Sequence, residues 1–231
     1  MIEFKDVALQ YHYEEYALLK GVSFALRDGI NTVLADTQSG KSSICKLLMK
    51  EIAANSGEIH VDGLQISSIT GADLGILYLP SNPTFFENKS VRFNVEYPLK
   101  VRKVAKKSRR EIAERVAASL GVDFLDEKVK KLTVRQRKLV ALARGLTVER
   151  KIVLFDDFFE DGDGTATPEY VDGVLNCFKR AVCVILSSNA RLARGNTVIL
   201  DGGLTVYEGD ADEAIGVVNG LTWIGESLGS K

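Results

Sequence analysis

Two kinds of apolar pattern run along the chain, and together they predict a protein of mixed strands and helices. Apolar residues nearly alternate over Ile2–Leu9 and Leu18–Leu26, which predicts two strands with one face on a core. Continuous apolar runs predict buried strands, as in a parallel sheet, and they occupy residues 31–34, 74–79, 152–155 and 182–186. Short strands with turn residues are expected over 57–63 and, as a hairpin, over 198–207. Helical spacing predicts helices over residues 42–49, 133–146, 168–178 and 210–219.

The composition changes near residue 99, and residues 92–145 are expected to form a mostly helical insertion. Capping boxes are predicted at Ser108–Glu111 and at Thr133–Gln136. From Lys100 to Arg110, seven of the eleven residues are Lys or Arg. We expect this basic run to be a solvated helix face. A surface for an acidic partner or for anionic lipid headgroups is the alternative.

Composition sets bounds on this picture. The 231 residues suffice for one large domain or for a domain with a subdomain, and we expect a single domain over residues 1–231. The net charge of −1 provides no general attraction to nucleic acid or to a membrane surface. No apolar run is long enough to cross a bilayer, and the first residues lack the pattern of a signal peptide. Cys45, Cys177 and Cys183 lie in apolar runs without metal-like spacing, so we expect reduced core cysteines of a cytosolic protein.

The stretch Ala35-Asp36-Thr37-Gln38-Ser39-Gly40-Lys41-Ser42 lies between a predicted buried strand and a predicted helix. This arrangement is typical of a phosphate-binding loop, in which backbone N–H groups and the positive helix end hold a polyphosphate. Lys41 is expected to reach the outer phosphates, and the Ser42 hydroxyl to bind Mg²⁺. Ala35 stands where this motif usually begins with glycine, so we expect it to restrict φ at a tight turn. The predicted nucleotide-binding residues of this stretch are Ala35, Gln38, Ser39, Gly40, Lys41, Ser42 and Ser43.

Two carboxylates and a tyrosine complete the candidate site. A predicted buried strand ends in Asp156 and Asp157, and carboxylates at such a strand end lie at the ligand crevice of an α/β sheet. We expect Asp156 to hold Mg²⁺, directly or through water. Tyr11, with Tyr13 and Tyr16, lies between the first two strands, where an aromatic ring could stack on a nucleotide base. A half-buried strand tyrosine is the equal alternative for each of them.

Several motifs occur in one order, and as a set they resemble the nucleotide-binding subunit of an ABC transporter. The loop at residues 35–42 resembles the Walker A motif, and Ile152–Asp157 resembles the Walker B strand. Lys131–Leu146 resembles the signature helix, most specifically in Val140-Ala141-Leu142-Ala143-Arg144. Smaller matches are Phe85-Phe86, Ser90–Asn94, Leu200–Gly203 and Glu208-Gly209. The resemblance covers residues 1 to about 212, and it implies an α/β fold: a P-loop NTPase core of ABC type with an antiparallel β subdomain and a helical insertion.

The resemblance also implies a role, that of a cytoplasmic ATP-binding subunit at the inner face of a membrane. The implied cofactors are ATP and Mg²⁺, and the implied partners are transmembrane permease subunits and a second ABC subunit. No nucleic acid is expected as a partner, and membrane association would run through the permease only. A regulatory or interaction subunit of the same fold, with ATP as a structural ligand, is the alternative. A small P-loop kinase fits less well, because it has no use for the helix at residues 131–146.

The positions that serve hydrolysis in the family are changed in this chain. The glutamine of the family's Q-loop falls on Ser81 or Asn82, and its switch histidine falls on Ser188. Its catalytic glutamate falls on Asp157, whose side chain is one methylene shorter, and a displacement near 1 Å can reduce a rate by about a hundredfold. We therefore expect retained MgATP binding, weak hydrolysis at most, with Asp157 as the catalytic residue, and a heterodimer with an intact subunit rather than a homodimer. Other changes place side chains where the family has glycine or proline, at Gln38, Val134, Arg135 and Phe158.

Overall fold

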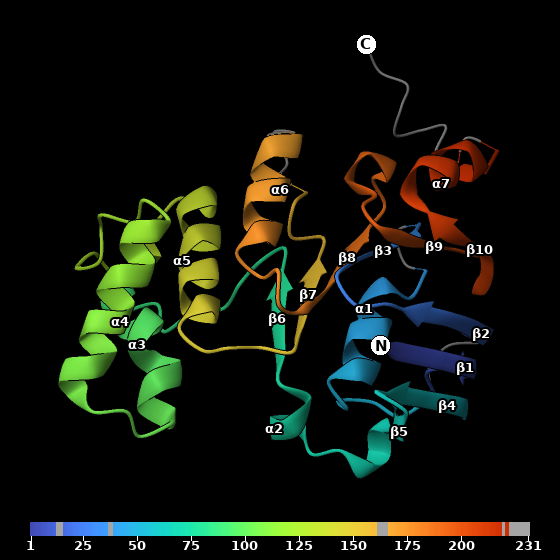
Figure 1. The fold of residues 1–231 in the computed structure, drawn as a ribbon, viewed down its shortest axis with the longest axis horizontal. Coiled ribbons are helices and arrows are strands. Elements are labelled where there is room, and N and C mark those ends of the chain that lie inside the picture. Colours follow the sequence, from blue (N-terminus) through green and yellow to red (C-terminus); the bar gives the residue numbers. More distant parts are fainter. Residues whose placement is uncertain (13–15, 37–38, 161–165, 219, 222–231) are drawn as a thin grey trace. The chain divides into compact units, whose positions relative to one another are not determined.

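The computed structural model describes residues 1–12, 16–36, 39–160, 166–218 and 220–221, and the chain divides into two compact units (Figure 1). One unit combines Met1–Tyr78 with Lys151–Lys231, and the other is formed by Leu79–Arg150. The segment expected to be a helical insertion, residues 92–145, falls within the second unit. No helix among the residues described has both the length and the apolar character needed to span a bilayer.

A four-stranded antiparallel sheet belongs to the first unit, and its strands lie in the order β2-β1-β4-β5. The predicted alternation is confirmed in its two longest strands, whose large apolar residues are buried while the residues between them are exposed or half-buried. Asp62 and Gly63 join β4 to β5 with φ values of 50° and 79°, as a tight hairpin turn requires. The strands are β1 (Ile2–Leu9), β2 (Leu19–Leu26), β4 (Ser56–Val61) and β5 (Leu64–Gln65).

A six-stranded sheet in the order β10-β9-β3-β8-β7-β6 carries the predicted buried strands. Strand β3 pairs in parallel with β8 and β9, and β7 pairs in parallel with β8. Strands β9 and β10 form the predicted antiparallel hairpin. The predicted strand over residues 74–79 begins later, because Leu74 ends the short helix α2 (Gly71–Leu74) and Gly75 follows with a φ of 58°. The strands are β3 (Ile30–Ala35), β6 (Ile76–Pro80), β7 (Ile152–Asp156), β8 (Val182–Ser187), β9 (Asn196–Asp201) and β10 (Leu204–Asp210).

Three longer helices accompany these sheets in the first unit: α1 (Lys41–Leu48), α6 (Pro168–Asn176) and α7 (Ala211–Val218). Helix α1 packs on β3, β7 and β8 through buried residues that include Ile44, Cys45 and Leu48. Helix α6 begins as its sequence predicts, with the Thr167 side chain as N-cap and Pro168 in the first turn. Single turns of 3₁₀ helix lie at Ile66–Ser68 and Ala190–Leu192.

The cysteines only partly fit the expectation of a buried, reduced set. Cys45 and Cys183 are buried, but Cys177 is exposed, so its predicted place in the core is wrong. Helix α6 buries Val171, Val174 and Leu175, and Cys177 caps the end of the helix away from this face. Its apolar neighbours in the sequence therefore do not reflect its own environment.

The second unit is built from α3 (Val91–Val101), α4 (Lys106–Ser119) and α5 (Val134–Leu146), with a 3₁₀ turn at Val129–Lys131. Its buried core includes Val91, Val95, Ala113, Ala117, Val129 and Val140. The predicted capping box at the start of α5 is confirmed: the Thr133 side chain accepts from the Gln136 N–H, and the Gln136 side chain accepts from the Thr133 N–H. The capping box predicted at Ser108 is wrong, because Ala105 is the N-cap of α4 and Ser108 already lies inside the helix.

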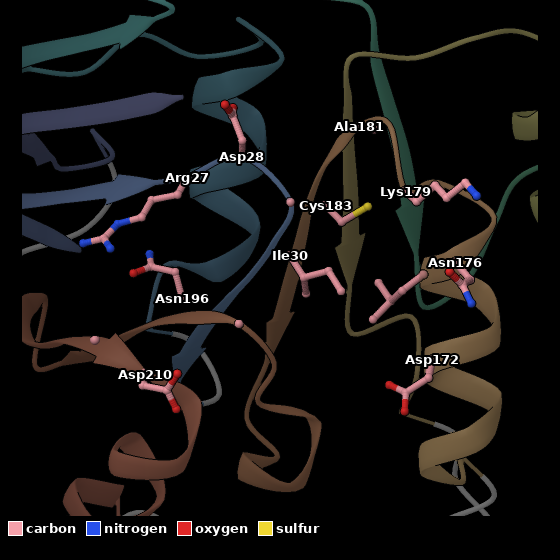
Figure 2. Close-up of a pocket in the computed structure, with 14 residues that line it drawn as sticks. Arg27, Asp28, Ile30, Asp172, Asn176, Lys179, Ala181, Cys183, Asn196 and Asp210 are labelled. Carbon is pink, nitrogen blue, oxygen red and sulfur yellow. The ribbon is translucent and has the colours of Figure 1, made fainter.

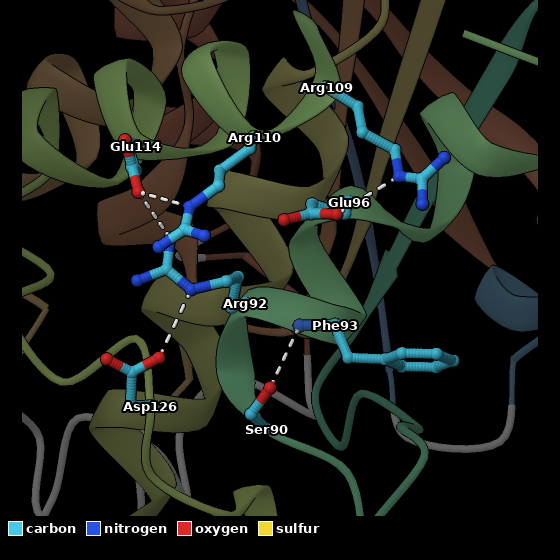
Figure 3. Close-up of polar contacts among 8 residues, drawn as sticks. All are labelled: Ser90, Arg92, Phe93, Glu96, Arg109, Arg110, Glu114 and Asp126. Atoms are coloured by element: carbon cyan, nitrogen blue, oxygen red, sulfur yellow. Dashed lines mark hydrogen bonds and ion pairs between the residues drawn. The ribbon is translucent and has the colours of Figure 1, made fainter. Parts of the chain in front are cut away.

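Ion pairs join the helices of the second unit, and part of the basic run takes part in them (Figure 3). Arg92 on α3 contacts Glu114 at 2.7 Å and Asp126 at 3.1 Å, and Arg110 contacts Glu114 at 3.1 Å. Arg109 contacts Glu96 at 3.1 Å (Figure 3). Of the basic residues between positions 100 and 110, Arg109 therefore links α4 to α3 and Arg110 pairs within α4, instead of facing only solvent.

Candidate functional site

The candidate phosphate-binding loop connects β3, which ends at Ala35, to α1, which begins at Lys41. Gly40 is the N-cap of α1 and has a φ of 98°, a backbone conformation that disfavours side chains. A Cβ atom at this position would lie 3.0 Å from the Leu19 Cδ2 atom. The positive φ therefore favours glycine here, and a Cβ atom would also crowd the Leu19 side chain of β2. The predicted binding residue Gln38 lies outside the described residues, with Thr37.

Ala35 does not occupy the strained turn that the sequence predicts. It is the last residue of β3, fully buried and paired with Leu200 of β9, and it is not among the residues with positive φ. The expected restriction of φ is therefore wrong, because an extended residue tolerates a methyl group. The Ala35 carbonyl instead accepts a hydrogen bond from Lys41 over 2.9 Å.

Lys41 is buried, and its ammonium group is hydrogen-bonded to the backbone of the loop. Its Nζ atom donates to the carbonyl oxygens of Ala35 and Asp36, each at 2.9 Å. The Ser39 N–H and hydroxyl also donate to the Asp36 carbonyl. Charged phosphate oxygens are stronger acceptors than backbone carbonyls, so this ammonium group is available to an anion that enters the loop.

Ser42 and Ser43 follow Lys41 in the first turn of α1, and they differ in exposure. The Ser42 side chain is exposed, whereas Ser43 is buried with its hydroxyl 3.0 Å from the Tyr11 hydroxyl. The Lys46 ammonium group also lies 5.9 Å from the Tyr11 ring centre. The structure thus places half-buried Tyr11 beside the helix that follows the loop, while stacking on a base stays a prediction.

Asp156 and the loop both lie at the carboxyl ends of the parallel strands. In the parallel register, Asp156 pairs with Leu186, and the next residue of β8, Ser187, pairs with Leu34 just before the loop. The Asp156 side chain is 5% exposed, and its Oδ2 atom accepts a hydrogen bond from the Tyr78 hydroxyl over 2.7 Å. Its Oδ1 atom is buried without a hydrogen-bond partner among the residues the structure describes.

An unpartnered carboxylate oxygen beside a phosphate-binding loop fits Mg²⁺. This ion prefers oxygen ligands, and in nucleotide sites it takes only one or two from the protein and the rest from phosphates and water. Within the described part of the chain, no cluster of three or more His, Cys, Asp or Glu side chains could hold a metal on its own. Asp156 is therefore not part of such a cluster among the described residues.

Asp157 occupies an unusual backbone conformation directly after β7. Its φ is 48°, and its N–H donates to the Leu186 carbonyl over 3.0 Å. Partial burial raises the pKa of its carboxyl to about 6, the Glu160 charge adds to this, and Lys41 opposes it. The Lys41 charge therefore acts on the Asp157 carboxyl, whose pKa is about 6.

Two functional candidates were missed in the sequence. Glu160 adds through its charge to the raised pKa of the Asp157 carboxyl, and it accepts from the Ser187 hydroxyl at 2.5 Å and the Ser188 N–H at 3.1 Å. The only local signal was an acidic residue shortly after the strand. Tyr78 was counted as an apolar strand residue, and its hydroxyl was the signal that could have distinguished it.

The remaining altered positions lie in different places. Phe158 is buried and Ser188 is half-buried, and both belong to the first unit. In the second unit, Val134 and Arg135 are exposed in the first turn of α5, and Ser81 is exposed after β6.

A pocket of about 860 Å³ lies in the first unit away from the loop (Figure 2). It is lined by residues that include Asp28 and Ile30, before and at the start of β3, and Cys183 near the start of β8. Because β3 and β8 are parallel, this pocket lies at the amino ends of these strands, whereas Lys41 and Asp156 lie at the carboxyl ends. It takes no part in the candidate site.

A family model described as ABC transporter matches residues 19–160, which is more than half of the chain. The matched segment contains the loop with Lys41, the capped helix α5, and β7 with Asp156. The α/β fold, with its antiparallel sheet, larger mixed sheet and helical segment, agrees with this match. The chain therefore belongs to the ABC transporter family, as an ATP-binding, nucleotide-binding domain of that family.

Proposed function

We propose that this chain is the ATP-binding subunit of an ABC membrane transporter, that it binds ATP together with Mg²⁺, and that it hydrolyses ATP weakly or not at all. The observation that carries the proposal is that Lys41 and Asp156 both lie at the carboxyl ends of the parallel strands, where a loop connects strand β3 to helix α1. Lys41 would bind the outer phosphates. Ser42 and Asp156 would hold Mg²⁺, which when bound neutralises phosphate charge.

Weak hydrolysis is supported by the surroundings of Asp157. A pKa of about 6 would by itself suit a general base, since such a group is mostly ionised at neutral pH yet still basic. Its side chain is short, however, and it lies in the field of the Glu160 charge, while Glu160 itself is held by Ser187 and Ser188. A short carboxyl group beside a second carboxyl group is poorly suited to orienting water against a phosphate.

Partnership with permease subunits and with a second ABC subunit is part of the same proposal. The second unit exposes an aromatic group in which the Phe86 ring lies 5.4 Å from Phe93 and 4.6 Å from Tyr97. Phe86 is 45% exposed and Tyr97 is 36% exposed. Clustered exposed aromatic rings favour a protein contact, and this cluster is a suitable place for a segment of the permease. The subunit would then lie on the cytoplasmic face of the membrane, held there by the permease alone.

The K41A variant tests nucleotide binding. We expect ATP affinity with Mg²⁺, measured by isothermal titration calorimetry, to fall at least about tenfold, because phosphate oxygens lose a charged hydrogen-bond donor. The matched control is K5A, which removes an exposed lysine of β1 and should leave the affinity unchanged. Equal affinity of K41A and the wild type, or no measurable binding by the wild type, would contradict the proposal.

A further inference from the structure

The two carboxylate oxygens of Asp156 lie in different environments. The Tyr78 hydroxyl, which comes from the neighbouring strand β6, donates to Oδ2 over 2.7 Å. Oδ1 is buried and makes no hydrogen bond to any residue in the described part of the chain. One oxygen is thus held by the protein, and the other is left for a ligand.

The hydrogen bond from Tyr78 has a clear electrostatic role. A buried carboxylate is costly unless donors compensate the water it has lost, and hydrogen bonds to charged groups are the stronger ones. A tyrosine phenol carries its hydrogen at neutral pH, so the Tyr78 hydroxyl can donate to Asp156 throughout the conditions of the measurement.

We propose that Tyr78 is a positioning residue for metal binding: by holding Oδ2 of Asp156, it leaves Oδ1 oriented as the oxygen that serves the Mg²⁺ of a bound nucleotide. This inference rests on the proposed function, since it requires MgATP as the ligand of the loop. Hydrogen-bond partners behind a metal ligand fix its orientation, and their loss typically reduces metal affinity by about 10–100-fold. Tyr78 therefore influences the metal without contacting it.

The Y78F variant tests this role, because it removes the hydroxyl and keeps the ring that packs against the core. ATP affinity is measured by titration calorimetry with excess Mg²⁺ and again with excess EDTA. We expect about tenfold weaker binding with Mg²⁺ and an unchanged affinity without metal. The affinity of the protein–ATP complex for Mn²⁺, followed by electron paramagnetic resonance, should fall by the same factor.

The matched control is Y207F. Tyr207 also lies within hydrogen-bond distance of a carboxylate, at 3.3 Å from Glu213 Oε2, but it belongs to β10, at the opposite edge of the sheet from β6. Y207F should bind MgATP like the wild type. If Y78F is too unstable for calorimetry, the rise in melting temperature on adding MgATP, compared with ATP and EDTA, gives the same comparison and should shrink.

A double variant shows whether Tyr78 acts through Asp156. In the D156N background the carboxylate is already gone, so adding Y78F should cause no further loss of Mg²⁺-dependent affinity. A further loss in that background would overturn the inference, as would equal affinities of Y78F and the wild type, or equal weakening with and without Mg²⁺. Absence of Mg²⁺-dependent ATP binding in the wild type would instead contradict the proposed function itself.

Discussion

At the scale of single residues, the least ordinary chemistry belongs to Asp157 and Glu160 after β7. Partial burial is the larger cause of the raised pKa of the Asp157 carboxyl, and the Glu160 charge adds to it. Lys41 and Asp156 are the other charged groups whose fields act on Asp157, with opposite effects. The fold therefore favours the neutral form of Asp157 more than water does.

This preference predicts a pH-dependent stability that D157N removes. The pKa of Asp157 rises from 3.8 to about 6 on folding, so its stabilising contribution is complete below about pH 4 and is lost as pH rises through about 6. Because asparagine resembles the protonated form, D157N should match the wild type near pH 4. At pH 8 it should melt a few degrees higher, for a gain of about 1 kcal/mol after solvent screening.

The measurement is thermal unfolding of both proteins between pH 4 and pH 8. A difference in melting temperature that stays constant over this range would show that Asp157 does not titrate as described. A wild type that is more stable than D157N at pH 8 would reverse the sign and contradict the assignment.

At the scale of elements, α5 is fastened to the segment that precedes α3. The Arg144 guanidinium lies 4.7 Å from the Phe85 ring centre and donates to the Thr84 carbonyl over 2.8 Å. Arg137, two turns earlier, lies 5.2 Å from the same ring and forms a two-point ion pair with Glu87. Phe85 is therefore flanked by two cationic planes, and the helix and the segment should move as one body.

The R144A variant should destabilise the protein by about 1 kcal/mol, because it removes a cation–π contact and a charged hydrogen bond at a half-buried site. R144K should recover only part of this loss, since an ammonium group lacks the planar stacking surface. The control is R135A, which removes an exposed arginine of the same helix and should change stability by less than about 0.5 kcal/mol. Urea unfolding followed by far-UV circular dichroism measures the stability of all three variants. Equal losses of stability in R144A and R135A would show that the Arg144 contacts do not stabilise the protein.

At the scale of the whole molecule, the resemblance to ABC subunits implies that each ATP is shared between the loop of one subunit and the signature of another. Here the signature start carries Val134 and Arg135, both exposed in the first turn of α5. Backbone N–H groups at a helix start bind phosphate best when small residues allow close approach. Two copies of this chain would meet the same obstruction at both sites, and a heterodimer would meet it at one.

We therefore expect the isolated chain to remain monomeric with MgATP, as measured by sedimentation velocity. The V134G/R135G variant should raise the dimer fraction, because it clears the path of the phosphate to the helix start. V134A/R135A is the control: it preserves helix propensity but keeps a Cβ at each position, and it should dimerise less. A stable ATP-induced dimer of the wild type, with brisk hydrolysis, would show that these side chains do not obstruct closure.

The sequence by itself was sufficient for the order of elements and for the loop. Periodicity of 2 or 3.6 residues, buried runs and capping residues are local signals, so β3, α1, β7 and the capped start of α5 could be placed without knowing any partner. Gly40 and Lys41 could be placed at the start of α1 for the same reason, and their part in phosphate binding stays a prediction. The expectation about Ala35 failed because it assumed a turn where the strand β3 still continues. The expectation about Cys177 failed because its apolar neighbours are buried and Cys177 is not.

Only the tertiary structure decided which polar groups meet at the site. Tyr78 and Asp156 are 78 positions apart, and Glu160 reaches Ser187 across 27 positions. These contacts arise because β6, β7 and β8 are neighbours in the sheet, an order that no local pattern encodes. The pKa of Asp157 and the difference between the two oxygens of Asp156 follow from that packing, since burial and donor geometry exist only once distant strands are side by side.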